Sequence, residues 1–175
     1  KEQYEKALSI NPKFAQALNN LGATCEIFGL KEQALQNYNK AIDQAPNYAE
    51  AHRNLSALKK YKKNDSQINL MESLYSNPNL SLSDKRNLSF ALAKVNEDLG
   101  NNDKFFKFLN EGNNLRKQEL NYSFTSSNNF HLSLLKAFES PPKIITQNEK
   151  NKSTVRPIFV LGMPRSGTTL VEQII

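Results

Sequence analysis

The feature that most limits the fold of this chain is a pattern of residues that returns about every 34 positions. Residues 15–48 read AQALNNLGATCEIFGLKEQALQNYNKAIDQAPNY. The small and apolar residues that set this pattern are Leu18, Leu21, Gly22, Ala34, Tyr38, Ala41 and Pro46. One period earlier, the residue types of the last three positions recur as Tyr4, Ala7 and Pro12. A hairpin of two helices with this spacing cannot bury its own apolar stripe, so the pattern predicts a stack of hairpins.

The spacing resembles that of the tetratricopeptide repeat, a pair of helices in ~34 residues. In such a unit Gly22 allows the paired helix to approach closely, Gly29 supplies the turn, and Pro46 ends the second helix. The stretch AEAHRNLSAL predicts a further first helix, and DSQINLMESLYSNP predicts a degenerate second one. A fourth unit is predicted at DKRNLSFALAKVNEDLGNNDKFFKFLNEGNNLRK, where Phe105 replaces the alanine of the regular unit. Residues 1–120 are therefore expected to form a mainly α, right-handed α-solenoid.

The cysteine and histidine side chains of this region are predicted to have structural rather than catalytic roles. Cys25 stands at an apolar contact position and is predicted to be a packed thiol. His52 replaces an aromatic residue at a contact between helices, and His131 lies in a short amphipathic helix. The aromatic residues predicted to belong to the core are Tyr38, Tyr48, Phe105 and Phe108. As the single cysteine, Cys25 excludes an intrachain disulfide and a cysteine cluster for zinc.

The composition and the charge of the chain limit the kinds of molecule that it is expected to bind. An apolar content of 38% favours an array with much exposed surface over one thick core. The net charge of +6 comes from scattered lysines, and the densest run, Lys59 to Lys63, is interpreted as a solvated helix end. No nucleic-acid partner is expected from this pattern. No apolar run reaches the ~18 residues of a membrane span, so we expect a cytoplasmic protein without a membrane segment. Because the first repeat is incomplete, the chain is interpreted as a fragment truncated at both ends.

The composition and the periodicity of the sequence change beyond the repeats. Residues 121–156 are predicted to form a connector with a short helix, because the stretch from Ser140 is polar, proline-containing and without period. Residues 157–175 then read as the start of a second domain: IFVLG predicts a buried parallel strand, MPRSG a turn and TTLVEQII a helix. Strand, tight loop and helix together are typical of a phosphate-binding loop.

Two kinds of phosphate loop fit this context. In the loop of nucleoside triphosphatases, G-x-x-x-x-G-K-[ST], a lysine follows the second glycine. Gly162 and Gly167 have that spacing, but Thr168 stands at the lysine position, which disfavours triphosphate hydrolysis. The cation is instead Arg165, whose guanidinium can donate to two oxygens of one phosphate.

The stretch GMPRSGTTL closely resembles the 5′-phosphosulfate-binding loop of sulfotransferases that use 3′-phosphoadenosine 5′-phosphosulfate (PAPS). Its arginine form is similar to that of tyrosylprotein sulfotransferases and of bacterial proteins that fuse tetratricopeptide repeats to a P-loop-like α/β sulfotransferase domain. The resemblance implies that Arg165 contacts the 5′-phosphosulfate and stabilises the leaving phosphate. It also implies that Ser166, Gly167, Thr168 and Thr169 bind PAPS through backbone amides, with hydroxyl donors from the three side chains. No metal is implied, and the catalytic base is expected beyond Ile175.

Two functions remain open at this point. The first is the N-terminal part of a PAPS-dependent sulfotransferase that modifies a hydroxyl acceptor, with protein tyrosine favoured only by the loop resemblance. The alternative is a tetratricopeptide scaffold that binds a protein or peptide without catalysis. For that function, Asn19, Asn20 and Asn54 are candidates, because they stand on first helices where amides can bind a peptide backbone. Glu172 is interpreted as a solvated or capping residue rather than a base.

Overall fold

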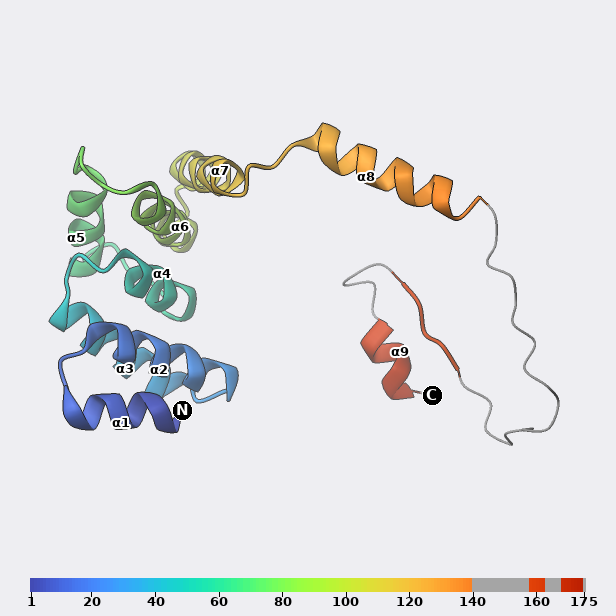
Figure 1. Cartoon of the computed structure of the whole chain (residues 1–175). Helices are drawn as coiled ribbons and strands as arrows, with labels where there is room; N and C mark the ends of the chain where they lie inside the picture. Colours follow the sequence, from blue (N-terminus) through green and yellow to red (C-terminus); the bar gives the residue numbers. More distant parts are fainter. Residues whose placement is uncertain (140–157, 163–167, 175) are drawn as a thin grey trace, which may run out of the picture. The chain divides into compact units, whose positions relative to one another are not determined.

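The computed structural model describes residues 1–139, 158–162 and 168–174 (Figure 1). Contacts divide the chain into two units, Lys1–Phe124 and Thr125–Ile175, and each unit is described by itself. The helices of the described residues are α1 (Glu2–Ile10), α2 (Ala15–Ile27), α3 (Lys31–Gln44), α4 (Ala49–Leu58), α5 (Ser66–Tyr75), α6 (Leu82–Asp98), α7 (Asn102–Glu119), α8 (Phe124–Ala137) and α9 (Thr168–Ile174).

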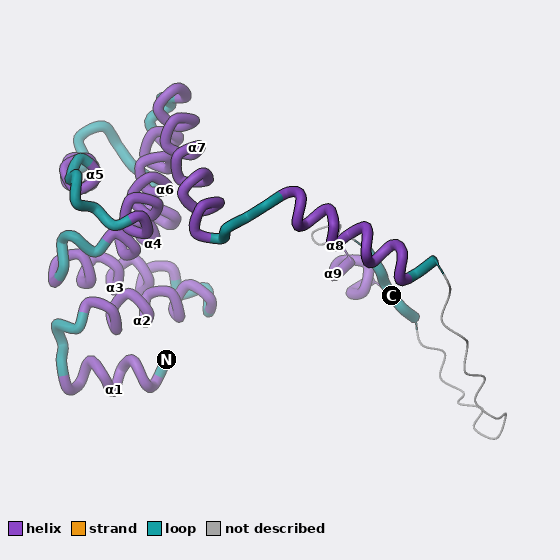
Figure 2. The backbone as a smooth tube through the Cα atoms, turned by 45° about the horizontal axis from the view of Figure 1, so that its top comes forward, coloured by secondary structure: helices purple, strands orange, loops and turns teal. Residues whose placement is uncertain are grey.

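The first unit is a stack of helices in which α2, α4 and α6 lie one above another (Figures 1 and 2). Helix α2 packs against α1 and α3, and α6 forms the most extensive hairpin with α7. Helix α4 packs on α3 and α6. The order of elements and their packing confirm the predicted helical repeat array.

The hairpin of α2 and α3 has the close approach that its sequence predicts. A Cβ atom on Gly22 would lie 2.6 Å from Cε1 of Tyr38, so only glycine leaves room for this ring. Tyr38 and Ala34 are fully buried, and Gly29 turns the chain with a φ of 71°, a conformation that glycine adopts without strain. The core around this hairpin consists of Leu18, Leu21, Cys25, Ala34, Tyr38, Ala41, Ile42, Ala51 and Leu55.

The next repeat is irregular, as its sequence indicates. Helix α4 ends at Leu58, and residues 59–65 form a connection from which Tyr61 points into the core, with 3% of its surface exposed. Helix α5 then begins after Asp65, whose carboxylate accepts a hydrogen bond from the backbone N–H of Gln67 at 3.1 Å. Helix α5 packs on α6.

A second core gathers around α6. Its buried members are Ala49, Tyr61, Ile68, Met71, Leu88, Ala91, Leu92 and Val95. Phe108 packs against this core, and its ring meets that of Tyr75 edge to face at a centroid distance of 5.3 Å. Phe105 is only half-buried and belongs to neither core, so its predicted core role is wrong. The physical reason is its place at the start of α7, where its ring contacts the exposed Phe106 instead.

The second unit holds α8, the segment Ile158–Gly162 and α9. Helix α8 provides the short helix predicted between residues 121 and 156; residues 140–157 lie outside the described part. The strand predicted at IFVLG is not found, since residues 158–162 have no regular structure and Phe159 is 79% exposed. A strand needs a neighbour to complete its backbone hydrogen bonds, and the described residues offer none there.

Candidate functional site

A row of polar side chains crosses α2, α4 and α6. The side-chain amide of Asn54 donates to Oδ1 of Asn19 at 2.9 Å, which joins α4 to α2. One repeat further, Nη1 of Arg53 donates to Oδ1 of Asn87 at 3.4 Å, which joins α4 to α6. We call these four residues the polar row; Asn19, Arg53 and Asn87 stand at matching places in successive repeats, and Asn54 follows Arg53 on α4. Asn19 and Asn87 are buried, so the two hydrogen bonds hold the half-buried Asn54 and the exposed Arg53 in place on α4.

The three asparagines predicted to bind a peptide have different roles in the structure. Asn19 is 1% exposed, and its amide also contacts the hydroxyl of Tyr48 at 3.4 Å. It therefore orients Asn54 rather than facing a ligand. Asn54 and Asn20 are half-buried, and each has side-chain hydrogen-bonding capacity that no other described residue uses. Asn54 is thus the strongest of the three candidates.

Arg53 of the polar row lies near two further arginines, and the sequence analysis did not single out any of the three. Arg53, Arg86 and Arg116 come from α4, α6 and α7, and with Phe90 they line a cavity of about 230 Å³. Their positions are scattered along the sequence, so no basic cluster is visible there. One feature of the sequence could have indicated this cavity: Arg53 and Arg86 are separated by roughly one repeat, which places them on neighbouring first helices of the stack.

His52 is a satisfied core residue. It is fully buried; its Nε2 lies 2.8 Å from the carbonyl oxygen of Pro46, and its Nδ1 lies 3.1 Å from Nε2 of Gln67. Burial lowers the pKa of His52, so the ring is neutral in the folded chain at neutral pH. Gln67 also accepts from the hydroxyl of Tyr61 at 3.0 Å. His52 therefore holds α4 to α5, as the sequence analysis predicted for a contact between helices.

Cys25 is also a packed core residue. Only 1% of its surface is exposed, and its Sγ lies 3.8 Å from Oε1 of Gln33 and 3.9 Å from Nδ2 of Asn37. A buried thiol of this kind behaves as a small apolar side chain. The prediction of a packed rather than reactive thiol is confirmed.

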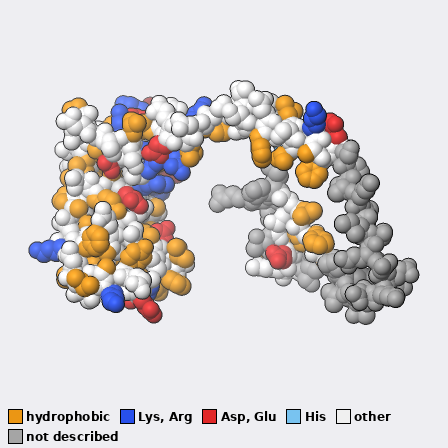
Figure 3. All heavy atoms as spheres, in the orientation of Figure 1, with side chains coloured by type: hydrophobic (Ala, Val, Ile, Leu, Met, Phe, Trp, Pro, Cys, Tyr) orange, Lys and Arg blue, Asp and Glu red, His pale blue; other side chains and the backbone are white. Residues whose placement is uncertain are grey.

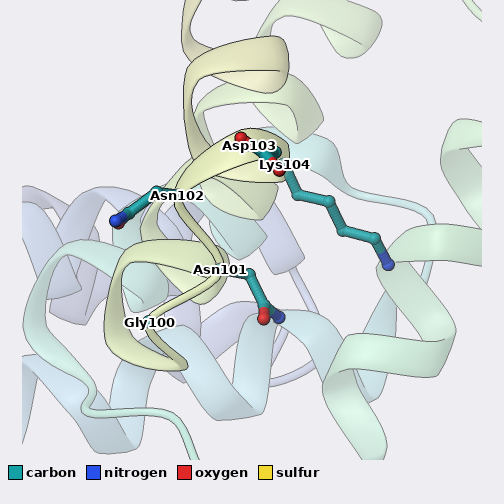
Figure 4. Close-up of a pocket in the computed structure, with 5 residues that line it drawn as sticks. All are labelled: Gly100, Asn101, Asn102, Asp103 and Lys104. Atoms are coloured by element: carbon teal, nitrogen blue, oxygen red, sulfur yellow. The ribbon is translucent and has the colours of Figure 1, made fainter.

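A larger hollow lies at the turn between α6 and α7, with a volume of about 590 Å³. It is lined by Gly100, Asn101, Asn102, Asp103 and Lys104 (Figure 4). The side chains of these residues point in different directions, and none converges with another on a common point. Binding sites place a few polar groups so that they converge on one ligand, and this hollow lacks that arrangement.

The predicted PAPS-binding residues fall at the limit of what the structure describes. Arg165, Ser166 and Gly167 lie outside the described residues. Thr168 is the first residue of α9 and is half-buried, and Thr169 follows it in the same helix. Glu172 is exposed on α9. The sulfate-donor site therefore remains a prediction from the sequence.

Across the described ranges, no group of three histidine, cysteine, aspartate or glutamate side chains is placed to hold a metal ion. Among the helices described, none combines the length and the apolar character needed to cross a bilayer.

Comparison with known proteins agrees with this architecture. The tetratricopeptide repeat model matches residues 3–36, which include all of α1 except Glu2, the whole of α2 and the start of α3. The chain therefore contains a tetratricopeptide repeat. An uncharacterized protein of Aquifex aeolicus (strain VF5) is 30% identical to this chain over all 175 residues. The chain spans 22% of the length of that relative.

Proposed function

We propose that the repeat array binds an extended peptide segment of a partner protein on the face of α2, α4 and α6. The observation that carries this proposal is that buried asparagines of α2 and α6, Asn19 and Asn87, hold the side chains of Asn54 and Arg53 in place on α4. Stacked repeats produce extended surfaces of this kind, and a peptide can cross several repeats at once. The tetratricopeptide match supports a role as a protein-binding scaffold.

The chemistry of Asn54 suits peptide backbone. One N–H of its amide is donated to Asn19, which fixes the orientation of the group. A side-chain amide carries two N–H donors and a carbonyl acceptor, so a second N–H and the oxygen remain for a ligand. A backbone amide of a bound peptide offers the matching acceptor and donor. A prepositioned amide binds at lower entropic cost than a free one.

A peptide library displayed on phage tests the proposal. Peptides selected on the 175-residue chain are synthesised, and their affinities are measured by calorimetry. We expect Asn54→Leu to weaken binding roughly tenfold, which corresponds to about 1.4 kcal/mol. The matched control is Asn39→Leu on α3, because Asn39 is exposed and its amide contacts only the Leu35 carbonyl of its own helix. Equal affinity for wild type and Asn54→Leu would contradict this role of the face.

A second candidate function concerns the C-terminal stretch. We propose that the complete protein is a PAPS-dependent sulfotransferase that modifies a hydroxyl acceptor, and that the repeats bring a protein acceptor to it. The observation that favours this function is the sequence GMPRSGTTL, with its arginine and its missing lysine. In the proposed mechanism Arg165 stabilises the negative charge of the leaving phosphate, and the groups of Ser166 to Thr169 orient the donor.

Donor binding separates the two functions. Arg165→Ala in the full-length protein is expected to abolish PAPS binding measured by calorimetry, and Arg165→Lys to reduce it, because lysine keeps the charge but not the paired donors. Lys40→Ala, which removes an exposed cation on α3, is the matched control and should bind PAPS normally. PAPS affinity that does not change in Arg165→Ala would exclude this mechanism. The scaffold function would be unaffected by that result.

A further inference from the structure

Helix α8 carries an apolar face that is exposed to solvent. Phe130 and Leu134 are four residues apart, so their side chains lie on the same face of the helix. Phe138 continues this face beyond the helix, since its backbone N–H donates to the carbonyl oxygen of Leu134 at 3.1 Å. Phe124 and Leu135 widen the face, and all five side chains, which we call the α8 face, are exposed. Figure 3 shows apolar side chains on the visible surface of α8. Exposed apolar patches of this kind mark surfaces that bind other groups.

The opposite side of α8 is polar and almost uncharged. It carries Thr125, Asn129, Ser133 and Lys136, and Lys136 is the single charged side chain of the helix. Helices that lie on membrane surfaces usually have a polar face rich in lysine and arginine. The α8 face is therefore better suited to an apolar protein surface than to a lipid surface.

A helix end of regular geometry separates α8 from the repeat array. Helix α7 ends at Glu119, and Asn121 follows with a φ of 46°, the left-handed conformation that often ends a helix. The backbone N–H groups of Asn121 and Tyr122 donate to the carbonyl oxygens of Gln118 and Lys117 at 3.0 and 3.2 Å, as in a Schellman motif. Helix α8 is therefore a separate element and not a continuation of α7.

The second unit holds a further set of exposed apolar side chains. Phe159 is exposed, and so is Leu161, at 88% of its surface. On α9, Leu170 and Ile174 are four residues apart on one face, and both are exposed. Glu172, midway between them in sequence, falls on the other side of the helix. These surfaces are apolar and uncharged, so contact with the α8 face would bury no unpaired charge.

The α8 face and these surfaces belong to one unit and are joined by a short stretch of chain. Contacts group α8 from Thr125 onward with Ile158–Gly162 and α9. Residues 140–157 link the two parts, and a stretch of this length spans at most roughly 60 Å. Such a tether keeps two surfaces at an effective concentration on the order of millimolar. A second copy of the chain, at ordinary concentrations, is therefore the weaker competitor for the α8 face.

We propose that the α8 face packs on the apolar side chains of Ile158–Leu161 and of α9. Helix α8 is then the first helix of the C-terminal unit rather than the end of the repeat array. The contact removes apolar surface of both partners from water, which is the driving force for the packing. The inference goes beyond both proposed functions, because neither a bound peptide nor PAPS takes part in the contact.

Nuclear Overhauser effects test this contact in the 175-residue chain, labelled at leucine methyl groups and phenylalanine rings. We expect cross-peaks between the methyl groups of Leu134 and the ring of Phe159. Leu134→Ala keeps a good helix former in α8 but removes the contact, so amide exchange should become about tenfold faster in α8 and in residues 158–161 alike. Phe159→Ala should have the same effect on α8. The double variant should exchange little faster than either single variant, since both changes remove one contact.

The matched control is Phe28→Ala, which removes an exposed ring at the turn between α2 and α3 and should change exchange in α8 less than about twofold. Cross-peaks from Leu134 to α7, with faster exchange of α8 in Phe106→Ala, would overturn the inference in favour of the repeat array. Protection of α8 that rises with protein concentration would overturn it in favour of a second copy. Exchange of α8 in the wild type at the rate of an unfolded peptide would show that the face packs on nothing. Arg165→Ala, which is expected to abolish PAPS binding, should leave the protection of α8 unchanged, so failure of the donor site and failure of this contact are distinguishable.

Discussion

The hairpin of α2 and α3 and the pair of α4 and α5 are successive repeats, yet different interactions hold them together. In α2 and α3 the contact is apolar, with the ring of Tyr38 against the backbone of Gly22. In α4 and α5 the contact is a buried hydrogen-bonded set in which Gln67 joins His52 and Tyr61. In α4 and α5 buried polar groups therefore add to the apolar packing of Ala49, Ile68 and Met71, and such groups need every partner to be present.

The largest effect is expected where the regular hairpin is broken. Tyr38→Ala removes a fully buried aromatic ring at the Gly22 contact, and its loss should lower the free energy of unfolding by about 3–5 kcal/mol. Urea unfolding followed by far-UV circular dichroism measures this change. Phe106→Ala is the control, because this ring is 56% exposed and its loss should cost no more than about 0.5 kcal/mol. Similar losses in both variants would mean that the Tyr38 contact does not hold the hairpin.

The irregular repeat has its own anchor, Asp98 at the end of α6. Its side chain is fully buried and accepts from the backbone amide of Tyr61 at 3.0 Å and from the ammonium groups of Lys60 and Lys94, each at 2.9 Å. Burial alone would raise the pKa of Asp98, but these donors lower it to about 2. The connection between α4 and α5 is therefore tied to α6 through a carboxylate.

Asp98→Asn tests this anchor. The amide is neutral and loses the charge-assisted bonds, so we expect the free energy of unfolding to fall by about 1.5–3 kcal/mol in urea titrations at pH 7. Because the folded pKa of Asp98 lies below its unfolded value of 3.8, the wild type should lose this contribution as the pH falls from about 4 toward 2. Glu97→Gln is the control: its pair with Lys94 is 53% exposed at the carboxylate and should contribute less than about 1 kcal/mol.

The smallest expected effect is a loss of stability at mildly acidic pH, and it arises in the irregular repeat alone. The folded pKa of His52 lies below the ordinary value of 6.5, so the unfolded chain binds the proton first and stability is lost as the pH falls below about 6.5. One proton changes the free energy of unfolding by at most about 1.4 kcal/mol per pH unit. Melting temperatures between pH 7 and 5 should fall less in His52→Gln than in wild type. His131→Gln, on the exposed helix α8, should behave as wild type; a common slope in all three proteins would refute the assignment.

The sequence predicted the first unit well because its signals are local. Gly22, Tyr38 and Pro46 report helix contacts and helix ends within one repeat, and the pattern repeats. Phe105 was predicted wrongly because its environment depends on where α7 starts. The strand at IFVLG was not found because strand pairing depends on residues far along a chain, which a local apolar run does not specify.

The candidate site was predicted only in part, for a related reason. Asn54 was identified from its place on a first helix, but nothing in the sequence shows that Asn19 is its partner. The cavity lined by Arg53, Arg86 and Arg116 was not predicted, because these residues are scattered along the sequence and meet only when α4, α6 and α7 stack. The geometry of such a site depends on the register between repeats, which charge counting does not reveal.

The length and position of α6 also set how the array opens. Helix α6 packs against α4, α5 and α7, whereas α1 packs against α2 and has no buried residue. We therefore expect α1 to open at a lower free energy than α6. Amide exchange would then show weaker protection in α1 than in α6.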